Sequence, residues 1–236
     1  MDKNKTYEKR ARLYPIIITM AFPFGLLSYF SIGLLPIDTS LATRIVVSLV
    51  PTGLLTAAFS FHFKNFIRSI SKWIFQFRYF KEDESYMPTT ELLLWENNKF
   101  TDSYKKRIRE KIEETFNVKL CTKASETKNE QEARKLIAEV VPQLRNMARD
   151  NDILFDYNCY FGSIRNVLGG CLVAMIIFVV LFFINLKYVV VPALLLVIPF
   201  GVYLLCFIFA KPFLKHFGYE YARKLYDAFM QVKVQR

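Results

Sequence analysis

The chain has few glycines, prolines and cysteines. Its 236 residues include only 8 Gly, 9 Pro and 4 Cys, while 53% of them are hydrophobic. This composition excludes a collagen-like chain, a disordered chain and a small disulfide scaffold. The four cysteines have no paired spacing, so we predict neither a disulfide framework nor a cysteine metal site.

Catalytic motifs are also missing. The sequence has no Gly-rich phosphate loop, no nucleophile elbow and no zinc-type spacing of Cys and His. Its two histidines, His62 and His216, lie at the edges of apolar segments, where packing is favoured over acid–base chemistry. Asp150, Asp152 and Asp156 cluster, but we expect them to be solvated rather than to bind a metal. The sequence therefore predicts a protein that is not an enzyme and has no cofactor.

Long uncharged segments are what the chain does contain. Each of the four has about 19 residues or more, which at about 1.5 Å per residue is enough to cross a hydrocarbon core of roughly 30 Å. They are Leu13–Ile37, Ile45–Phe63, Asn166–Leu186 and Tyr188–Ala210. We predict an all-α membrane protein with four transmembrane helices, arranged as two hairpins that flank a cytoplasmic helical region.

The excess of positive charge belongs to the flanks of these segments. Residues 82–165 contain 14 basic and 16 acidic side chains, and the rest of the chain contains 18 and 5. The basic pI therefore does not indicate nucleic-acid binding. By the positive-inside rule, both termini and the central region are predicted to be cytoplasmic. The predicted parts are residues 1–63 (tail and first hairpin), 64–81 (interfacial basic-aromatic helix), 82–165 (cytoplasmic domain), 166–210 (second hairpin) and 211–236 (amphipathic tail).

The second apolar segment carries a stripe of hydroxyl groups. Ser48, Thr52, Thr56 and Ser60 recur every fourth residue, and Lys64, Arg68 and Lys72, followed by Trp73, continue beyond the apolar segment. Lipid offers hydroxyls no partner, so the stripe faces either a pore or another helix. We prefer helix packing and keep pore lining as the alternative. The basic-aromatic residues from Lys64 onward suit the headgroup layer.

Three helices are predicted in the cytoplasmic region. Thr89 or Thr90 can cap a short helix through Leu92–Trp95, and Tyr104, Ile108, Ile112 and Phe116 form one face of a helix over Asp102–Phe116. Residues 118–129 are expected to form a loop. Asn129 and Glu132 resemble a capping box that opens a longer helix, which Pro142 should kink or split. Beyond Asn151 we expect a helix that continues into the third apolar segment.

Two sets of cations are candidates for binding a ligand. Lys105, Lys106 and Arg109 belong to a basic run that could hold a phosphate, although neighbouring glutamates favour a solvated face. Arg145, Arg149 and Arg165 are the second set, with ion pairing to Asp150, Asp152 or Asp156 as the alternative.

One stretch of the chain resembles a family of small bacterial membrane effectors from anti-phage defence loci, the Hailong type. The similarity covers about Met87–Gly170. It rests on Pro88-Thr89-Thr90, on Leu144-Arg145 with Arg149-Asp150, and on a motif from Asn158 to Asn166 that ends in Arg165-Asn166. In that motif Phe161 and Ser163 depart from the family's aromatic pattern. The resemblance implies location in the bacterial inner membrane, a nucleotidyltransferase partner, and control by its nucleotide or DNA oligomer product.

Two functions are compatible with these features. The first is an oligomeric membrane effector of antiviral defence that forms or gates an ion-conducting pore under control of a cytoplasmic ligand or partner. The second is a non-conducting anchor that recruits a soluble partner through the cytoplasmic helices. Ser48, Thr52, Thr56 and Ser60 would line the pore in the first and only pack helices in the second, while Asn158, Arg165 and Asn166 would belong to the regulatory site.

Overall fold

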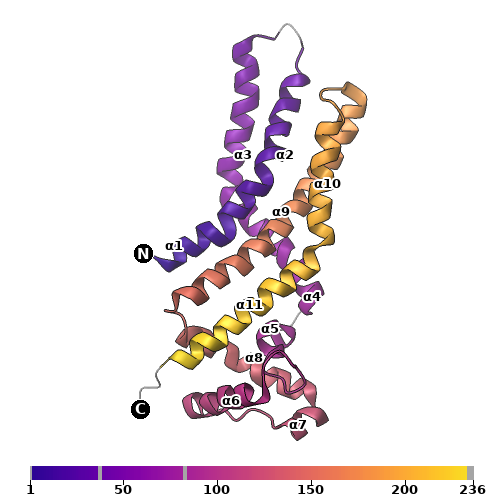
Figure 1. Ribbon diagram of the computed structural model, residues 1–236. Helices are drawn as coiled ribbons and strands as arrows, with labels where there is room; N and C mark the ends of the chain where they lie inside the picture. The colour runs from indigo at the N-terminus through magenta and orange to yellow at the C-terminus, as the bar shows by residue number, and fades with distance from the viewer. Residues whose placement is uncertain (1, 37–38, 82–83, 233–236) are drawn as a thin grey trace. The chain divides into compact units, whose positions relative to one another are not determined.

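The computed structural model describes residues 2–36, 39–81 and 84–232, and within one helix it leaves the side chains of residues 41, 48–52 and 54–61 undescribed. The described residues form helices and no β-strand, which confirms the predicted all-α class (Figure 1). By contacts the chain divides into two compact units. Unit 1 comprises residues 1–75 and 162–211, and unit 2 comprises residues 76–161 and 212–236.

The first half of the chain forms two long helical runs. The elements of the first run are α1 (Lys3–Tyr7), the π-helix η1 (Glu8–Leu13) and α2 (Tyr14–Gly33). Those of the second are α3 (Leu41–Ile70), the π-helix η2 (Ser71–Phe77) and α4 (Arg78–Phe80). Ser40 opens α3 by accepting from the amide of Thr43. The predicted basic-aromatic segment thus continues the helix of the apolar segment before it.

The second half contains eight further elements. They are η3 (Glu84–Tyr86), α5 (Pro88–Glu91), α6 (Asp102–Phe116), α7 (Lys123–Lys128), α8 (Glu130–Met147), α9 (Asp152–Tyr188), α10 (Leu194–Ile208) and α11 (Ala210–Gln231). As predicted, α9 runs without a break from the polar region into the third apolar segment. Its first ten residues belong to unit 2 and the others to unit 1.

Among the residues that the structure describes, two helices are long and apolar enough to cross a membrane. They are Lys3–Gly33, with 31 residues, and α9, with 37. A third is added if α10 and α11, bent by 51° at their junction, count as one span. These helices support the prediction of a membrane protein. The four-span layout stays a prediction, because many side chains of α3 are outside the described set.

Unit 1 is held together by a close helix seam. Helices α2 and α3 lie side by side (Figure 1), and Met20, Phe30 and Ile67 join Phe178 of α9 in one core. Gly169 lies directly against Ile67 and Ser71, and Gly170 lies against Thr19. Any side chain at these glycines would collide with a neighbour, so Gly169 and Gly170 permit the close approach of the helices.

The turn between α9 and α10 is closed by one side chain. Asn185 donates to the carbonyl of Val191 at 2.8 Å and accepts from the amide of the same residue at 2.9 Å. These bonds satisfy both backbone polar groups of Val191, which is 5% exposed. Val189, in the turn itself, has a positive φ of 49°.

Unit 2 is a small helical assembly with α11 as part of its core. Ile108 and Ile112 of α6, Ile137 and Leu144 of α8, and Leu225 of α11 are all buried. Tyr226 and Phe229 are also buried, and the Tyr226 hydroxyl donates to the carbonyl of Thr89. The amphipathic helix predicted for the tail is confirmed, but this face of it packs against protein.

Several local predictions are confirmed by the caps. The helix over Asp102–Phe116 has the predicted bounds, with Thr101 accepting from the amide of Tyr104. Asn129 caps α8 and accepts from the amide of Glu132. However, α8 is not split, since it continues through Pro142 to Met147.

The predicted helix over Leu92–Trp95 is wrong. Helix α5 has already ended at Glu91, and the following residues form turns. Leu92, Leu93 and Leu94 are all buried. A helix buries one face, so three consecutive residues that all enter the core favour an irregular backbone instead.

The loop predicted over residues 118–129 is wrong in part. It contains α7, which is capped by Thr122. The buried residue of this short helix is Glu126, a charged side chain. Because α7 has no apolar face, the pattern of apolar residues does not predict this helix.

Candidate functional site

The hydroxyl stripe lies on one helix, as predicted. Ser48, Thr52, Thr56 and Ser60 all fall within α3, but their side chains lie outside the described residues. The choice between pore lining and helix packing stays a prediction.

The cations that follow the stripe are partly used within unit 1. Lys64 forms an ion pair with Glu8 of η1 at 2.7 Å, and the same carboxylate pairs with Arg12. Trp73 is 70% exposed, whereas Arg68 and Lys72 are half-buried. Lys64 therefore ties the cytoplasmic end predicted for α3 to the helix before α2.

The basic run of α6 is divided by burial. Lys105 is fully buried and Arg109 is 8% exposed, while Lys106 is exposed and lies 3.9 Å from Glu110. The expectation of a solvated face holds for Lys106 and is wrong for Lys105 and Arg109. Successive helical residues point about 100° apart, so neighbours in sequence need not share an environment.

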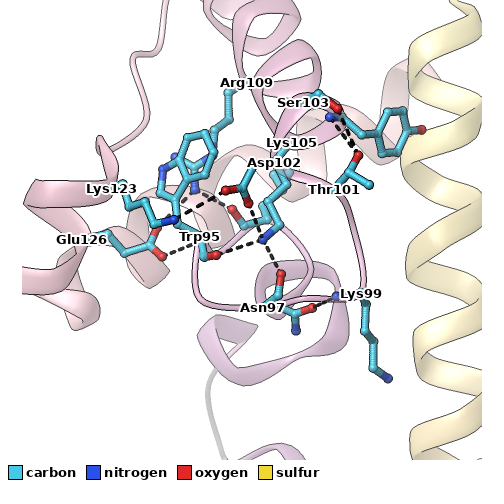
Figure 2. A network of polar contacts seen from close by, with 12 residues as sticks. Trp95, Asn97, Lys99, Thr101, Asp102, Ser103, Lys105, Arg109, Lys123 and Glu126 are labelled. Carbon is cyan, nitrogen blue, oxygen red and sulfur yellow. Dashed lines mark hydrogen bonds and ion pairs between the residues drawn. The ribbon is translucent and has the colours of Figure 1, made fainter.

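The two buried cations serve the backbone of the turns after α5. Figure 2 shows the Lys105 ammonium directed at the carbonyls of Trp95 and Asn97, with an Nζ–O distance of 3.1 Å to Trp95. The Arg109 guanidinium donates to the carbonyls of Leu93 and Cys121, the latter at 2.6 Å. These bonds take the place of the helical bonds that this segment lacks.

Two carboxylates balance this cluster. Asp102 lies 3.9 Å from the Lys105 ammonium, and Glu126 accepts from Arg109 at 3.2 Å and also from the backbone amide of Trp95. Burial lowers the pKa of both Lys105 and Arg109, while Asp102 and Glu126 act against that shift in Lys105 and Glu126 acts against it in Arg109. The Arg109 guanidinium also stacks over the Trp95 ring, 4.6 Å from its centroid. The Lys105 ammonium and the two terminal nitrogens of Arg109 thus bond to protein groups, and a ligand role for these residues stays a prediction.

The remaining regulatory candidates are divided between the two units. In unit 2, Arg145 lies 3.7 Å from Glu84, rather than pairing with the predicted aspartates. Arg149 is exposed and Asn158 is half-buried. Arg165 and Asn166 belong to unit 1, so the predicted residues do not form one cluster within a unit.

Asn166 has a structural role at the start of the seam. Its amide donates to the carbonyl of Ala11 at 2.6 Å, and its oxygen lies 3.5 Å from the Ser71 hydroxyl. Arg165 is also buried, with Tyr7, Arg12 and Arg68 as its electrostatic neighbours. The Arg165-Asn166 pair of the sequence motif therefore lies where η1, η2 and α9 meet.

A separate polar hollow in unit 2 was not predicted. It has a volume of about 380 Å³ and is lined by Leu92, Lys99, Lys215, His216, Tyr219, Glu220 and Arg223. Leu92 and Lys99 come from the turns after α5, and the others come from α11. Figure 2 shows Lys99 pointing away from the cluster around Lys105.

The hollow has an excess of positive charge. The Lys99 ammonium lies 3.2 Å from the centroid of the Tyr219 ring. Burial lowers the pKa of Lys99, and the nearby Arg223 and Lys215 lower it further, while Glu91 and Glu220 raise it. Glu91 is engaged by the Tyr219 hydroxyl, which donates to it.

Only some of the residues that line this hollow could be predicted from the sequence to lie together. Lys215, Tyr219 and Arg223 are four residues apart and share one face of a helix. That spacing identifies a polar face of α11. It does not identify Lys99, which lies more than a hundred positions earlier in the chain.

The described ranges contain no cluster of side chains that could bind a metal ion. No group of three or more His, Cys, Asp or Glu side chains there could hold a metal ion. The four cysteines form no disulfide in the described ranges, and Cys159 and Cys171 are buried. Comparisons of the chain with protein-family models, with curated proteins and with solved structures give no match.

Proposed function

We propose that this protein is a multi-span membrane effector in which unit 2 receives a cytoplasmic signal and unit 1 responds within the membrane. The observation that carries the proposal is the continuity of α9, whose residues are shared between the two units. A continuous hydrogen-bonded helix is a rigid element, so a displacement at its polar end reaches its apolar end.

The packing of α9 in unit 1 supports such a response. Asn166 is bonded to Ala11, while Gly169 and Gly170 contact the helical runs that contain η2 and α2. Close-packed seams change by discrete steps rather than by gradual deformation. A shift of α9 would therefore disturb both runs together.

The proposed response is the formation or gating of a pore in a homo-oligomer. The hydroxyl stripe of α3 would line that pore, since hydroxyl-lined pores need no charged side chain. On the resemblance to Hailong-type effectors, the signal would be the nucleotide or DNA oligomer product of a partner nucleotidyltransferase, and the membrane would be the bacterial inner membrane.

Ion flux from proteoliposomes tests this proposal. The full chain is reconstituted at rising protein-to-lipid ratios, because mass action favours oligomers at high density, and release of trapped potassium is measured. We expect flux that rises steeply with protein density and changes in the Thr52→Val/Thr56→Val double variant.

The matched control removes two hydroxyls of α2. Ser28 and Ser31 donate to the carbonyls of Phe24 and Leu27 in their own helix, at 3.1 and 2.9 Å. Ser28→Ala/Ser31→Ala should leave the flux unchanged at equal insertion. Absence of flux at every density would contradict the pore and favour the non-conducting anchor.

A further inference from the structure

The polar hollow of unit 2 holds three cations that the fold does not neutralise. No ion pair joins Lys99, Lys215 or Arg223 to a carboxylate in the part of the chain that the structure describes. The contrast with α6 is direct, because Arg109 there has Glu126 as its counter-charge. In the hollow, Glu91 and Glu220 act on Lys99 from nearby, but two carboxylates stand against three cations.

The carboxylates near the hollow only partly offset these cations. Glu220 lines the hollow, and Glu91 accepts the Tyr219 hydroxyl beside it. Lys215 and Arg223 are close enough to Lys99 to lower its pKa. Repulsion of this kind is relieved when an anion enters, so the arrangement favours a ligand with negative charge.

The lining indicates what kind of anion fits. Arg223 offers a planar fork of donors that matches phosphate oxygens, and Lys99 and Lys215 act as point charges beside it. Leu92 and the ring of Tyr219 supply an apolar wall. With a volume of about 380 Å³, the hollow has room for a phosphate together with a part of the group that carries it.

Because of the position of the hollow along the chain, the phosphate could come either from a lipid or from a soluble compound. Lys215 is seven residues beyond the end of α10 at Ile208, a helical rise of roughly 10 Å. If α10 crosses the membrane, Lys215 lies a few Å beyond a headgroup layer that is roughly 5–7 Å thick. Its long side chain can reach back toward a lipid phosphate. A soluble phosphate compound in the cytoplasm can reach it as well.

We propose that this hollow, lined by Lys99, Lys215 and Arg223, is a binding site for a phosphate group carried by a lipid headgroup or by a soluble phosphate ester. The site deepens the proposed function by giving unit 2 a ligand class. It differs from the regulatory residues predicted from the sequence, and binding at it requires no pore.

Binding to the purified full chain tests the site without measuring flux. In a neutral detergent, pyrophosphate is titrated by calorimetry. In nanodiscs of phosphatidylcholine with a minor fraction of phosphatidic acid, the lipids retained by the protein are measured by native mass spectrometry. Binding in the first arm identifies a soluble source, and enrichment of phosphatidic acid in the second identifies the headgroup.

A matched pair of double variants separates the site from bulk charge. Lys215→Ala/Arg223→Ala should weaken the observed binding at least about tenfold. Lys106 and Arg107 of α6 are exposed, as Lys215 and Arg223 are, but they do not line the hollow. Lys106→Ala/Arg107→Ala removes the same charge and should change the binding less than about twofold. Equal effects of the two pairs, or no binding in either arm, would overturn the proposal.

A third variant guards against misfolding as an explanation. Glu220→Gln removes the carboxylate that lines the hollow and should tighten phosphate binding about threefold or more. A gain of affinity does not arise from an unfolded protein. If Glu220→Gln leaves binding unchanged or weaker while the protein remains folded, the hollow is not the site. Flux can fail while this binding persists, so the two proposals are tested separately.

Discussion

The two units differ in the charged groups that they bury. In unit 1 the buried polar side chains include the neutral Thr19, Ser71, Asn166 and Asn185 and one cation, Arg165, and Asn166 and Asn185 bond to backbone groups. In unit 2 they include the neutral Ser85, Thr89 and Thr90 and the charged Lys105, Arg109 and Glu126, of which Glu126 pairs with Arg109. The difference follows the solvent that each unit is predicted to face.

A charge is costly wherever water is absent. A neutral amide or hydroxyl can satisfy a carbonyl inside a membrane without a counter-ion, and close contacts at glycine supply the remaining attraction. A unit with water nearby can use a lysine or arginine whose charge is balanced by one carboxylate. Unit 2 therefore stabilises irregular backbone with cations, and unit 1 holds its helices together through close packing.

The largest effect is expected from removing the counter-charge of unit 2. Glu126→Ala leaves Arg109 buried without its carboxylate, which should lower the free energy of unfolding by about 3–5 kcal/mol. Unfolding is followed in detergent by the fluorescence of Trp95, in a Trp73→Phe background that removes the other tryptophan.

Glu110→Ala is the control for that variant. Glu110 is exposed and lies 3.9 Å from Lys106, so its loss should change the free energy of unfolding by less than about 1 kcal/mol. Similar losses in both variants would show that the buried cluster contributes no more than a surface ion pair.

The corresponding change in unit 1 is a single methyl group. In Gly169→Ala the new Cβ would lie 2.9 Å from the carbonyl oxygen of Ile67 and would also meet Ser71, at a cost of about 1–3 kcal/mol. Heating in detergent with a thiol-reactive dye reports the loss of packing, because Cys171 is 2% exposed in the folded protein.

Gly201→Ala provides the comparison within the same unit. A Cβ at Gly201 meets nothing within 4 Å, so this variant should melt at the temperature of the parent chain or above. An equal fall in melting temperature for both glycines would mean that the seam at Gly169 is not tightly packed.

The smallest effect concerns a tyrosine that ties α6 to α11 within unit 2. The Tyr104 hydroxyl donates to Asp227 at 2.8 Å. Burial raises the pKa of Tyr104, and the hydrogen bond to Asp227 raises it further. Tyr104→Phe should cost about 1 kcal/mol at pH 7. Because the folded pKa exceeds the unfolded value, this contribution is fully present below a pH of about 10 and is lost as the pH rises through the folded pKa.

Denaturant unfolding between pH 7 and 10.5 measures this dependence. The difference between the parent chain and Tyr104→Phe should be constant up to pH 9 and then shrink. Asp227→Asn keeps an acceptor and removes the charge, so it should retain most of the stability at pH 7. A difference that grows with pH would contradict the assignment.

Local signals explain the correct predictions. Asn129 caps α8 through a bond to a residue three positions away, and the helix over Asp102–Phe116 follows from apolar residues at helical spacing. The continuous helix after Asn151 follows from an unbroken pattern without glycine until Gly162. Such interactions depend on neighbours in sequence, so a pattern can show them. The long apolar helices were predictable for the same reason.

Contacts between distant residues explain what the sequence left open. Lys105 and Lys106 are adjacent and chemically identical, yet one is buried and the other exposed. What separates them is the turn at Trp95 and Asn97, whose carbonyls need donors. This irregular segment forms because Leu92, Leu93 and Leu94 all enter the core.

The sequence by itself determined the helical class, the apolar segments, the bounds of α6 and the cap of α8, because each depends on residues within a few positions of one another. Only the tertiary structure decided which cations serve the backbone and which line the hollow. Lys99 and Arg223 meet there through folding alone, since burial and charge balance depend on neighbours in space.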